Sequence, residues 1–297
     1  MKDRAREGAD GRRKATWGEL LAEARRLLPL PGHPAFEAEE LLGRAAGRPR
    51  SWFHSRRGES AGPSEAAAFR RLVERRAAGE PLQYLLGEWE FLGRTFRVDP
   101  RALIPRGETE GIVEVAREAA PAARRILDLG TGSGVLAVTL ALERPSATVL
   151  ALDRSPAALA LARENAAHHG VGARVRLLAS DWLSALRPGA VFDLAVANPP
   201  YVPLADAPHL SKTVSEHEPP IALYGGEDGL DPVRKLLRAL PPFLTPGAPF
   251  LFEFGYGQAR AVSDLVEASG SFRLVAVRLD AAGIPRTATA VFAPASR

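Results

Sequence analysis

The chain has 297 residues, of which 46% are hydrophobic and 25% charged, a composition typical of a globular protein large enough for two domains. It contains no cysteine, which excludes disulfide bonds, catalytic thiolates and cysteine-ligated zinc, and its net charge of +4 is too small to indicate a nucleic-acid partner by itself. Neither an apolar run of about 18 residues nor a secretory signal is evident, so we expect a cytoplasmic protein without a membrane span.

The N-terminal part of the chain is predicted to be helical. Residues 1–15 are polar and rich in Arg and Gly, without periodicity, so we expect a disordered tail. Thr16 and Glu19 have the spacing of a capping box, which predicts the start of a helix. Amphipathic helical patterns follow at 17–28, 34–46 and 64–78. One helix cannot bury its own apolar stripe, so these patterns predict a small α-helical bundle domain over residues 16–80.

A short segment separates this bundle from the rest of the chain. Residues 88–98 alternate apolar and polar side chains about a turn that contains Gly93, which is the signature of a β-hairpin. We therefore predict a hairpin linker over residues 81–100 and a second domain over residues 101–297.

The second domain alternates short apolar runs with amphipathic stretches. Strands are predicted at 125–129, 148–152, 175–178, 191–197, 248–254, 272–277 and 287–292. Helices are predicted near 134–143, 156–169, 230–240 and 258–269. Such alternation implies right-handed crossovers, so we predict an α/β fold with a Rossmann-like, mostly parallel seven-stranded sheet covered on both faces.

A glycine-rich turn follows the first of these strands. Asp128 lies one residue before the end of the predicted strand, and the turn reads Gly130, Thr131, Gly132, Ser133 and Gly134. In a sheet of this kind a nucleotide-like ligand lies beyond the carboxyl ends of the strands, where glycines allow close approach of the backbone. The loop lacks the GxGxxG spacing of dinucleotide sites, and Asp128 would repel a pyrophosphate but attract a cationic amino group. These features favour S-adenosylmethionine over NAD.

Polar residues also end the next two strands. Asp153 lies 25 residues after Asp128, where a carboxylate accepts hydrogen bonds from both ribose hydroxyls. Asp181 is suited to the adenine amino group and Trp182 to the face of the ring. Taken singly, Asp153 also fits a helix N-cap and Trp182 a core position.

The fourth predicted strand is followed directly by Asn198, Pro199, Pro200 and Tyr201. The two prolines stop the strand and stiffen the loop, and neither carries an N–H. The Asn198 amide oxygen and the nearby carbonyls are therefore acceptors for an incoming NH2 group, and Tyr201 offers a flat face to a planar amide or base. This loop is the predicted catalytic and substrate-binding site.

These motifs resemble class I S-adenosylmethionine-dependent methyltransferases that modify planar amino groups. Further segments resemble the HemK/PrmC family of protein-(glutamine-N5) methyltransferases in particular. They are residues 81–87, Phe91 with Gly93, residues 103–110, residues 127–134, Asp181 with Trp182, residues 218–219 with 222–223, residues 225–226 with 228–230, and Glu253 with Gly255 and Gln258. The resemblance covers nearly all of the chain after residue 16.

The resemblance implies a function and a partner. Members of this family methylate the glutamine of the Gly-Gly-Gln motif in class 1 peptide chain release factors, which supports translation termination, and they convert S-adenosylmethionine to S-adenosylhomocysteine. On this resemblance the glycine loop and Asp153 hold the methionine and ribose parts, Trp182 lies near the adenine, and residues 198–201 hold the glutamine. We expect a monomer that binds no metal, membrane or, directly, nucleic acid.

Other interpretations remain open on the residues alone. An adenine or cytosine amino methyltransferase would use the same loop, because Tyr201 also suits a flipped base. A binding module without activity, or an enzyme acting on a small molecule, would retain the cofactor loop. Two kinds of role are open for Arg106, Glu108, Glu110 and Arg286: helix capping and surface charge, or gating of substrate entry.

Overall fold

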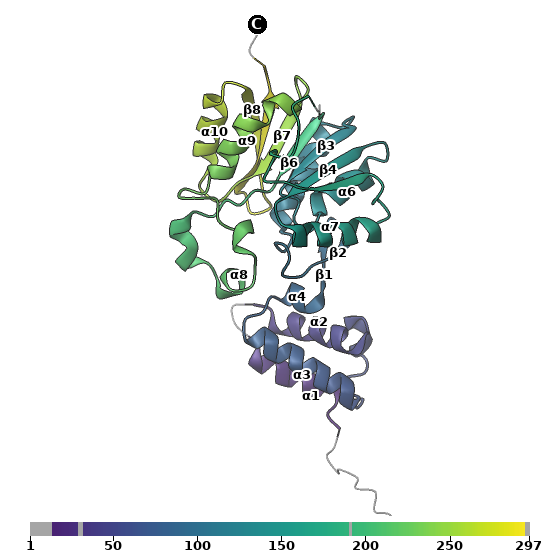
Figure 1. Cartoon of the computed structure of the whole chain (residues 1–297). Helices are drawn as coiled ribbons and strands as arrows, with labels where there is room; N and C mark the ends of the chain where they lie inside the picture. Colours follow the sequence, from purple (N-terminus) through teal and green to yellow (C-terminus); the bar gives the residue numbers. More distant parts are fainter. Residues whose placement is uncertain (1–13, 29–31, 190–191, 295–297) are drawn as a thin grey trace, which may run out of the picture. The chain divides into compact units, whose positions relative to one another are not determined.

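The computed structural model describes residues 14–28, 32–189 and 192–294 (Figure 1), and the chain divides into two compact units between Leu86 and Gly87. The predicted tail over residues 1–15 lies outside the described residues except for Lys14 and Ala15. None of the helices in the described ranges has the length and apolar character needed to cross a bilayer.

The first unit is the predicted helical bundle. Its helices are α1 (Trp17–Leu27), α2 (Pro34–Ala46), α3 (Pro63–Ala77) and α4 (Leu82–Leu86). The predicted capping box is confirmed, since Glu19 N donates to Thr16 Oγ1 (3.2 Å) and Thr16 N donates to Glu19 Oε2 (2.8 Å). The apolar stripes meet in one core, in which Leu20, Leu41, Phe53 and Phe69 are almost completely buried.

The segment predicted as a linker is divided between the two units. Leu82 and Leu85 of α4 belong to the core of the first unit. The hairpin of β1 (Glu88–Phe91) and β2 (Arg94–Arg97) belongs to the second, because its Phe91 and Phe96 are buried in that unit's core. Two adjacent aromatic residues on one face of the hairpin favour packing on the sheet domain over a free connection.

The second unit contains a seven-stranded sheet of order β5-β4-β3-β6-β7-β9-β8. Its strands are β3 (Arg125–Leu129), β4 (Thr148–Asp153), β5 (Val175–Ala179), β6 (Leu194–Ala197), β7 (Pro249–Glu253), β8 (Phe272–Leu279) and β9 (Pro285–Phe292). The first five strands of this order pair in parallel, and β9 is antiparallel to both β7 and β8. The predicted α/β class with a mostly parallel sheet is confirmed.

The fourth predicted strand is shorter than the apolar run suggested. The run was predicted to pair over residues 191–197, but β6 begins at Leu194, and Val191 lies outside the described residues. Phe192 makes only an isolated bridge to Leu244. The Asp193 carboxylate accepts from the backbone N–H groups of residues 124 and 125 (3.1 and 3.0 Å), and the Asp193 N–H donates to the Arg125 carbonyl (2.8 Å), so this residue is tied to the start of β3 just ahead of β6.

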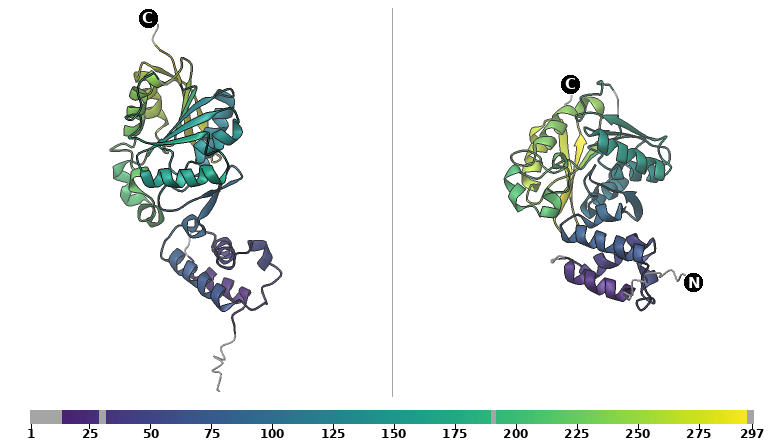
Figure 2. Two further views of the ribbon diagram at one scale, coloured as in Figure 1. Left: turned by 45° about the vertical axis from the view of Figure 1, so that its right-hand side comes forward. Right: turned by 60° about the horizontal axis from the view of Figure 1, so that its bottom comes forward.

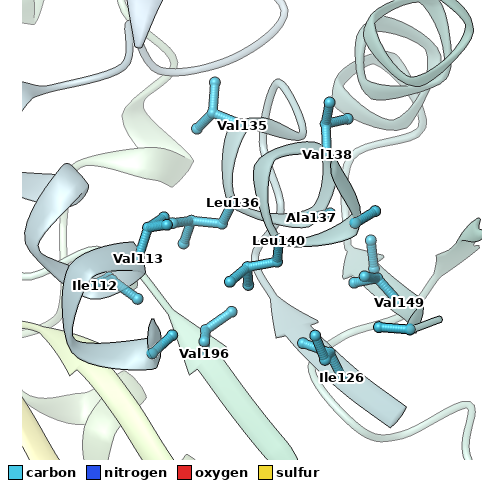
Figure 3. Packing of buried hydrophobic residues seen from close by; sticks show 14 of the residues in the cluster. Ile112, Val113, Ile126, Val135, Leu136, Ala137, Val138, Leu140, Val149 and Val196 are labelled. Carbon is cyan, nitrogen blue, oxygen red and sulfur yellow. The ribbon is translucent and has the colours of Figure 1, made fainter. Parts of the chain in front are cut away.

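Helices cover both faces of the sheet (Figure 2). They are α5 (Glu110–Ala119), α6 (Val135–Glu143) and α7 (Pro156–His168) on one face, α9 (Asp231–Ala239) and α10 (Ala259–Ala268) on the other, and the short α8 (Lys212–Ser215) in a connection. Neighbouring strand residues point to opposite faces, so Ile126 joins the core under α5 and α6 (Figure 3), whereas Leu127 joins the core under α9 and α10.

The core under α6 contains a buried hydroxyl group without a hydrogen-bond partner among the described residues. Thr139 is completely buried in α6, and its hydroxyl has no hydrogen-bond partner among the described residues. A buried hydroxyl without a partner loses its hydration without compensation. We expect Thr139→Val, which keeps the shape of the side chain, to raise the free energy of unfolding by about 1 kcal/mol. Urea denaturation of both proteins measures the change, and a destabilised variant would contradict the assignment.

Candidate active site

A cavity of about 320 Å³ opens at the carboxyl ends of β3, β4 and β6. It brings together most of the residues predicted to hold a cofactor. These are Gly130, Thr131, Gly132, Ser133, Asp153, Asp181, Trp182 and Asn198. Pro200 also lines it, whereas Gly134 and Asp128 are not among the lining residues of the described chain. The predicted convergence of strand ends therefore forms one hollow of a size suited to a nucleoside-type ligand.

The glycine loop has the backbone geometry that only glycine adopts easily. Gly130, Gly132 and Gly134 have φ values of +73°, +56° and +83°. A Cβ on Gly134 would lie 3.0 Å from Cβ of Ala162, so this position also lets the loop pack closely against α7. At Gly130 and Gly132 the backbone itself forms the cavity wall, without side chains.

Asp153 lines the cavity but does not cap α7, whose N-cap is Ser155. Its Oδ1 accepts from Ser155 N (2.8 Å) before α7, and its Oδ2 accepts from Gly132 N (2.9 Å). Each carboxylate oxygen carries a further lone pair, and the residue lines the cavity, so the side chain remains able to accept from ribose hydroxyls. Asp153 thus ties the glycine loop to the second strand end.

Asp128 occupies a different environment from the predicted one. The side chain is completely buried and its Oδ2 accepts from Thr131 Oγ1 (2.6 Å). Burial raises the pKa of this carboxyl to about 7. In this geometry Asp128 supports the glycine loop through its hydrogen bond with Thr131. A direct contact between Asp128 and a ligand amino group would require a change in the conformation of the loop.

Trp182 lies beside the glycine loop at the cavity. An added Cβ on Gly130 would be 3.5 Å from Cζ3 of the indole, which places the ring against that part of the loop. Trp182 itself has φ of +52°, a conformation that is uncommon for a bulky residue. Residue 182 therefore has a strained backbone conformation, and its half-buried indole lies where the sequence predicts contact with the adenine.

A second cavity of about 620 Å³ adjoins the first. Asn198, Leu103, Arg106 and Ala222 line both. The second cavity is also lined by Pro199 and Tyr201, the other two residues predicted to be catalytic. Asn198 therefore stands at the junction between a predicted cofactor cavity and a predicted substrate cavity.

The Asn198 side chain is held by a chain of hydrogen bonds. Its Nδ2 donates to Thr109 Oγ1 (2.8 Å), and Thr109 Oγ1 donates to Glu253 Oε2 (2.7 Å). Its Oδ1 is buried and has no partner among the described residues. A buried acceptor without a protein partner is costly unless a water molecule or a ligand supplies the donor.

Glu253 is completely buried at the end of β7, and burial raises its pKa to about 7. The Tyr201 hydroxyl interacts with the same carboxyl, and burial, together with the nearby Glu253 charge, raises the pKa of the phenol above its usual range. Thr109 and Glu253 were recognised in the sequence only as parts of motifs, because nothing in their spacing indicates that they meet.

Gln258 and two glycines hold the loop after Asn198 in place. Gln258 Nε2 donates to the carbonyls of Tyr201 (3.0 Å) and Asp228 (3.1 Å), while its Oε1 accepts from Gly255 N (2.7 Å). A Cβ on Gly229 would lie 2.1 Å from the Tyr201 carbonyl oxygen, so only glycine permits this approach. The loop is therefore fixed from two sides.

Two of the undecided charged residues, Arg106 and Glu110, have structural partners. The Arg106 guanidinium donates to Glu218, a buried carboxylate that also accepts from Ile104 N (3.1 Å). Glu110 Oε1 accepts from Leu92 N (2.7 Å) at the hairpin turn. Arg106 lines both cavities, whereas Glu110 anchors the hairpin.

Arg286 and Glu108 differ in their surroundings. Arg286 Nε donates to Asp280 Oδ2 (3.1 Å), and the guanidinium lines the second cavity. Glu108 is exposed, and its charge contributes to the raised pKa of Glu253. Only Arg286 of this pair is placed to face a ligand.

Family models match both parts of the chain. Residues 19–87 match the model described as PrmC N-terminal domain, and residues 109–213 match the methyltransferase small domain. Among solved structures, the hMettl16 catalytic domain in complex with the MAT2A 3'UTR hairpin 6 aligns with a TM-score of 0.54 at 13% identity, over 76% of this chain and 94% of that one. At this identity the likeness shows the fold alone.

Curated proteins are similar over most of the chain. The release factor glutamine methyltransferase of Moorella thermoacetica is 45% identical over 275 residues, which are 91% of this chain and 96% of that protein. The proteins of the same name from Geobacter sulfurreducens and Bordetella pertussis are 46% and 44% identical, over 79% and 88% of this chain and 81% and 96% of their own lengths.

The position of Asp153 predicts a specific loss of cofactor binding. We expect Asp153→Ala to weaken S-adenosylmethionine binding by at least about tenfold, because charge-assisted hydrogen bonds contribute about 1.5–3 kcal/mol each. Isothermal titration calorimetry measures the change. Asp153→Asn, which keeps one acceptor oxygen, is the control and should lose less. An unchanged affinity in Asp153→Ala would remove this residue from the ribose site.

Proposed function

The chain belongs to the family of release factor glutamine methyltransferases, and from this we propose that it methylates the side-chain amide nitrogen of the glutamine in the Gly-Gly-Gln motif of class 1 peptide chain release factors. The observation that carries this proposal is the unpartnered, buried Asn198 Oδ1 at the junction of the two cavities. An amide NH2 group supplies the donor that this oxygen lacks.

The first cavity fits S-adenosylmethionine as the methyl donor. Its wall combines a backbone loop open at the glycines, a carboxylate at Asp153 and an indole at Trp182. In the proposed complex residues 130–134 and Asp153 hold the methionine and ribose parts, and Asp181 and Trp182 hold the adenine. The bound cofactor supplies an electrophilic methyl group on a sulfonium centre.

The protein's task is to present the glutamine nitrogen correctly. A carboxamide nitrogen is a weak nucleophile because its lone pair is delocalised into the carbonyl group, so catalysis depends on holding it within about 3–3.5 Å of the methyl carbon and in line with the leaving sulfur. We propose that Asn198 Oδ1 and the Pro199 carbonyl each accept one N–H. These two bonds orient the nitrogen and stabilise the positive charge that develops on it.

No general base is required before attack. The Tyr201 phenol remains protonated, since burial raises its pKa, and the Glu253 carboxyl is engaged by the Thr109 hydroxyl. The nitrogen becomes acidic only after it has gained the methyl group, and its proton then leaves to water. Tyr201 lines the second cavity, where it packs against the amide and excludes water from it.

The mechanism predicts a loss of turnover without an equal loss of cofactor binding. We expect Asn198→Ala to lower kcat about a hundredfold, comparable to removing one preorganised polar contact from a transition state. The dissociation constant for S-adenosylmethionine should change by much less. Single-turnover methyl transfer and calorimetry measure the two effects, and unchanged turnover would contradict the acceptor role of Asn198.

The acceptor is identified by transfer of a tritiated methyl group. Purified release factor should gain one methyl group, and the release factor with its Gly-Gly-Gln glutamine changed to glutamate should gain none, because it lacks the amide nitrogen. DNA and ribosomal RNA serve as competing acceptors in the same assay. Labelling of nucleic acid without labelling of the release factor would favour an adenine or cytosine methyltransferase instead.

A further inference from the structure

The Thr109 hydroxyl has one proton and must serve two neighbours. Glu253 lies 2.7 Å on one side and the Asn198 amide nitrogen 2.8 Å on the other. An ionised carboxylate accepts hydrogen bonds and donates none, so the Thr109 proton goes to Glu253. The hydroxyl oxygen is then left as an acceptor and matches an N–H, not another oxygen. This order of donors forces the NH2 end of Asn198 toward Thr109.

The orientation of Asn198 decides what the ligand meets. If the Asn198 carboxamide were turned by 180° about the Cβ–Cγ bond, it would present its NH2 group to the incoming NH2 group, and two donors do not form a hydrogen bond. With Nδ2 tied to Thr109, the side chain presents Oδ1, which has no partner among the residues described. We propose that Thr109 and Glu253 are positioning residues that lock the Asn198 carboxamide with its oxygen toward the substrate amide; this inference rests on the proposed function.

The burial of Thr109 and Glu253 is typical of residues that fix the orientation of a neighbouring side chain, and not of a surface contact. Thr109 is 3% exposed and Glu253 is completely buried, and they join the start of α5 to the end of β7 across 144 residues of sequence. The charged groups that act on Glu253 are Glu108 and Arg286. Since burial raises the pKa of Glu253 to about 7, the carboxylate form dominates at pH 8, where the tests are best made.

Thr109→Val removes the hydroxyl and keeps the shape of the side chain. We expect kcat to fall by at least about tenfold, the equivalent of one hydrogen bond, with S-adenosylmethionine affinity within about twofold of wild type. Thr109→Ser restores the hydroxyl and should recover most of the turnover. Thr139→Val is the matched control, because it makes the same change at a buried threonine of α6 outside the site. Equal losses in the Val and Ser variants at position 109 would overturn the inference.

Glu253 is tested with a pair of variants of its own. Glu253→Leu removes the acceptor for the Thr109 proton, whereas Glu253→Gln keeps an acceptor oxygen in a side chain of the same length. We expect the Leu variant to lose at least about tenfold in kcat and the Gln variant to lose less. Equal turnover of the two variants would remove Glu253 from the lock.

A double-mutant cycle separates positioning from simple packing. If Thr109 acts through Asn198, adding Thr109→Val to Asn198→Ala should lower kcat by no more than about twofold beyond Asn198→Ala alone. A residue that only supports the fold would give losses that multiply. Thermal unfolding of each variant identifies any that is not folded, and the Ser variant keeps the comparison valid in that case.

A measurement without substrate keeps this inference distinct from the proposed function. The side-chain amide protons of Asn198, assigned by comparison with Asn198→Ala, should exchange more slowly in wild type and Thr109→Ser than in Thr109→Val. If wild-type enzyme transfers no methyl group to a release factor, the proposed function fails, but these NMR signals still report the lock. Equal exchange in all three proteins would overturn the lock whatever the substrate.

Discussion

The Thr109 hydroxyl lies between two groups that each need a hydrogen-bond partner, the Asn198 amide and the buried Glu253 carboxyl. One proton and two lone pairs satisfy both, but only in one order. The order leaves the Asn198 oxygen as the acceptor without a partner at the junction of two cavities, and in the proposed transfer this oxygen orients the glutamine nitrogen. The geometry of the site therefore depends on the contact between Thr109, which also lines the first cavity, and the buried Glu253.

This contact places a carboxyl group where hydration cannot stabilise it. A buried charge is costly unless it is paired or hydrogen-bonded, and Glu253 has the Thr109 hydroxyl, the Tyr201 phenol and the positive field of Arg286 to offset that cost. Its pKa rises only to about 7, so it is not fixed as a neutral acid at physiological pH. The same arrangement keeps Tyr201 protonated and fixed at the edge of the second cavity.

The sequence predicted the parts of the site that lie at strand ends. Glycine turns and polar residues after apolar runs are local signals, and parallel strands bring their carboxyl ends together, so the sequence alone assigns Gly130, Asp153 and Asn198 to one edge of the sheet. Thr109 and Glu253 carry no such signal, because a threonine before a helix and a glutamate after a strand have many ordinary roles. Their relation depends on the pairing of elements far apart in sequence.

Packing also explains two differences between expectation and structure. Asp128 is the penultimate residue of β3 and is completely buried, so its carboxylate supports Thr131 instead of lining the cavity. Asp193 lies within the apolar run, and its carboxylate accepts from the N–H groups of residues 124 and 125 at the start of β3, while β6 begins one residue later at Leu194. In both cases the residue type was compatible with the prediction, and the depth of the side chain decided its role.

The lock also explains why residue 198 is an asparagine and not an aspartate. A carboxylate at this position would stabilise the developing positive charge more strongly, yet it would need a proton from Thr109, whose only proton is already given to Glu253. Two carboxylates separated by one hydroxyl would repel each other, and one would take up a proton and lose its advantage as an acceptor. An amide offers a donor to Thr109 and an acceptor to the substrate at once. The residue that matches both demands is the one that the chain carries.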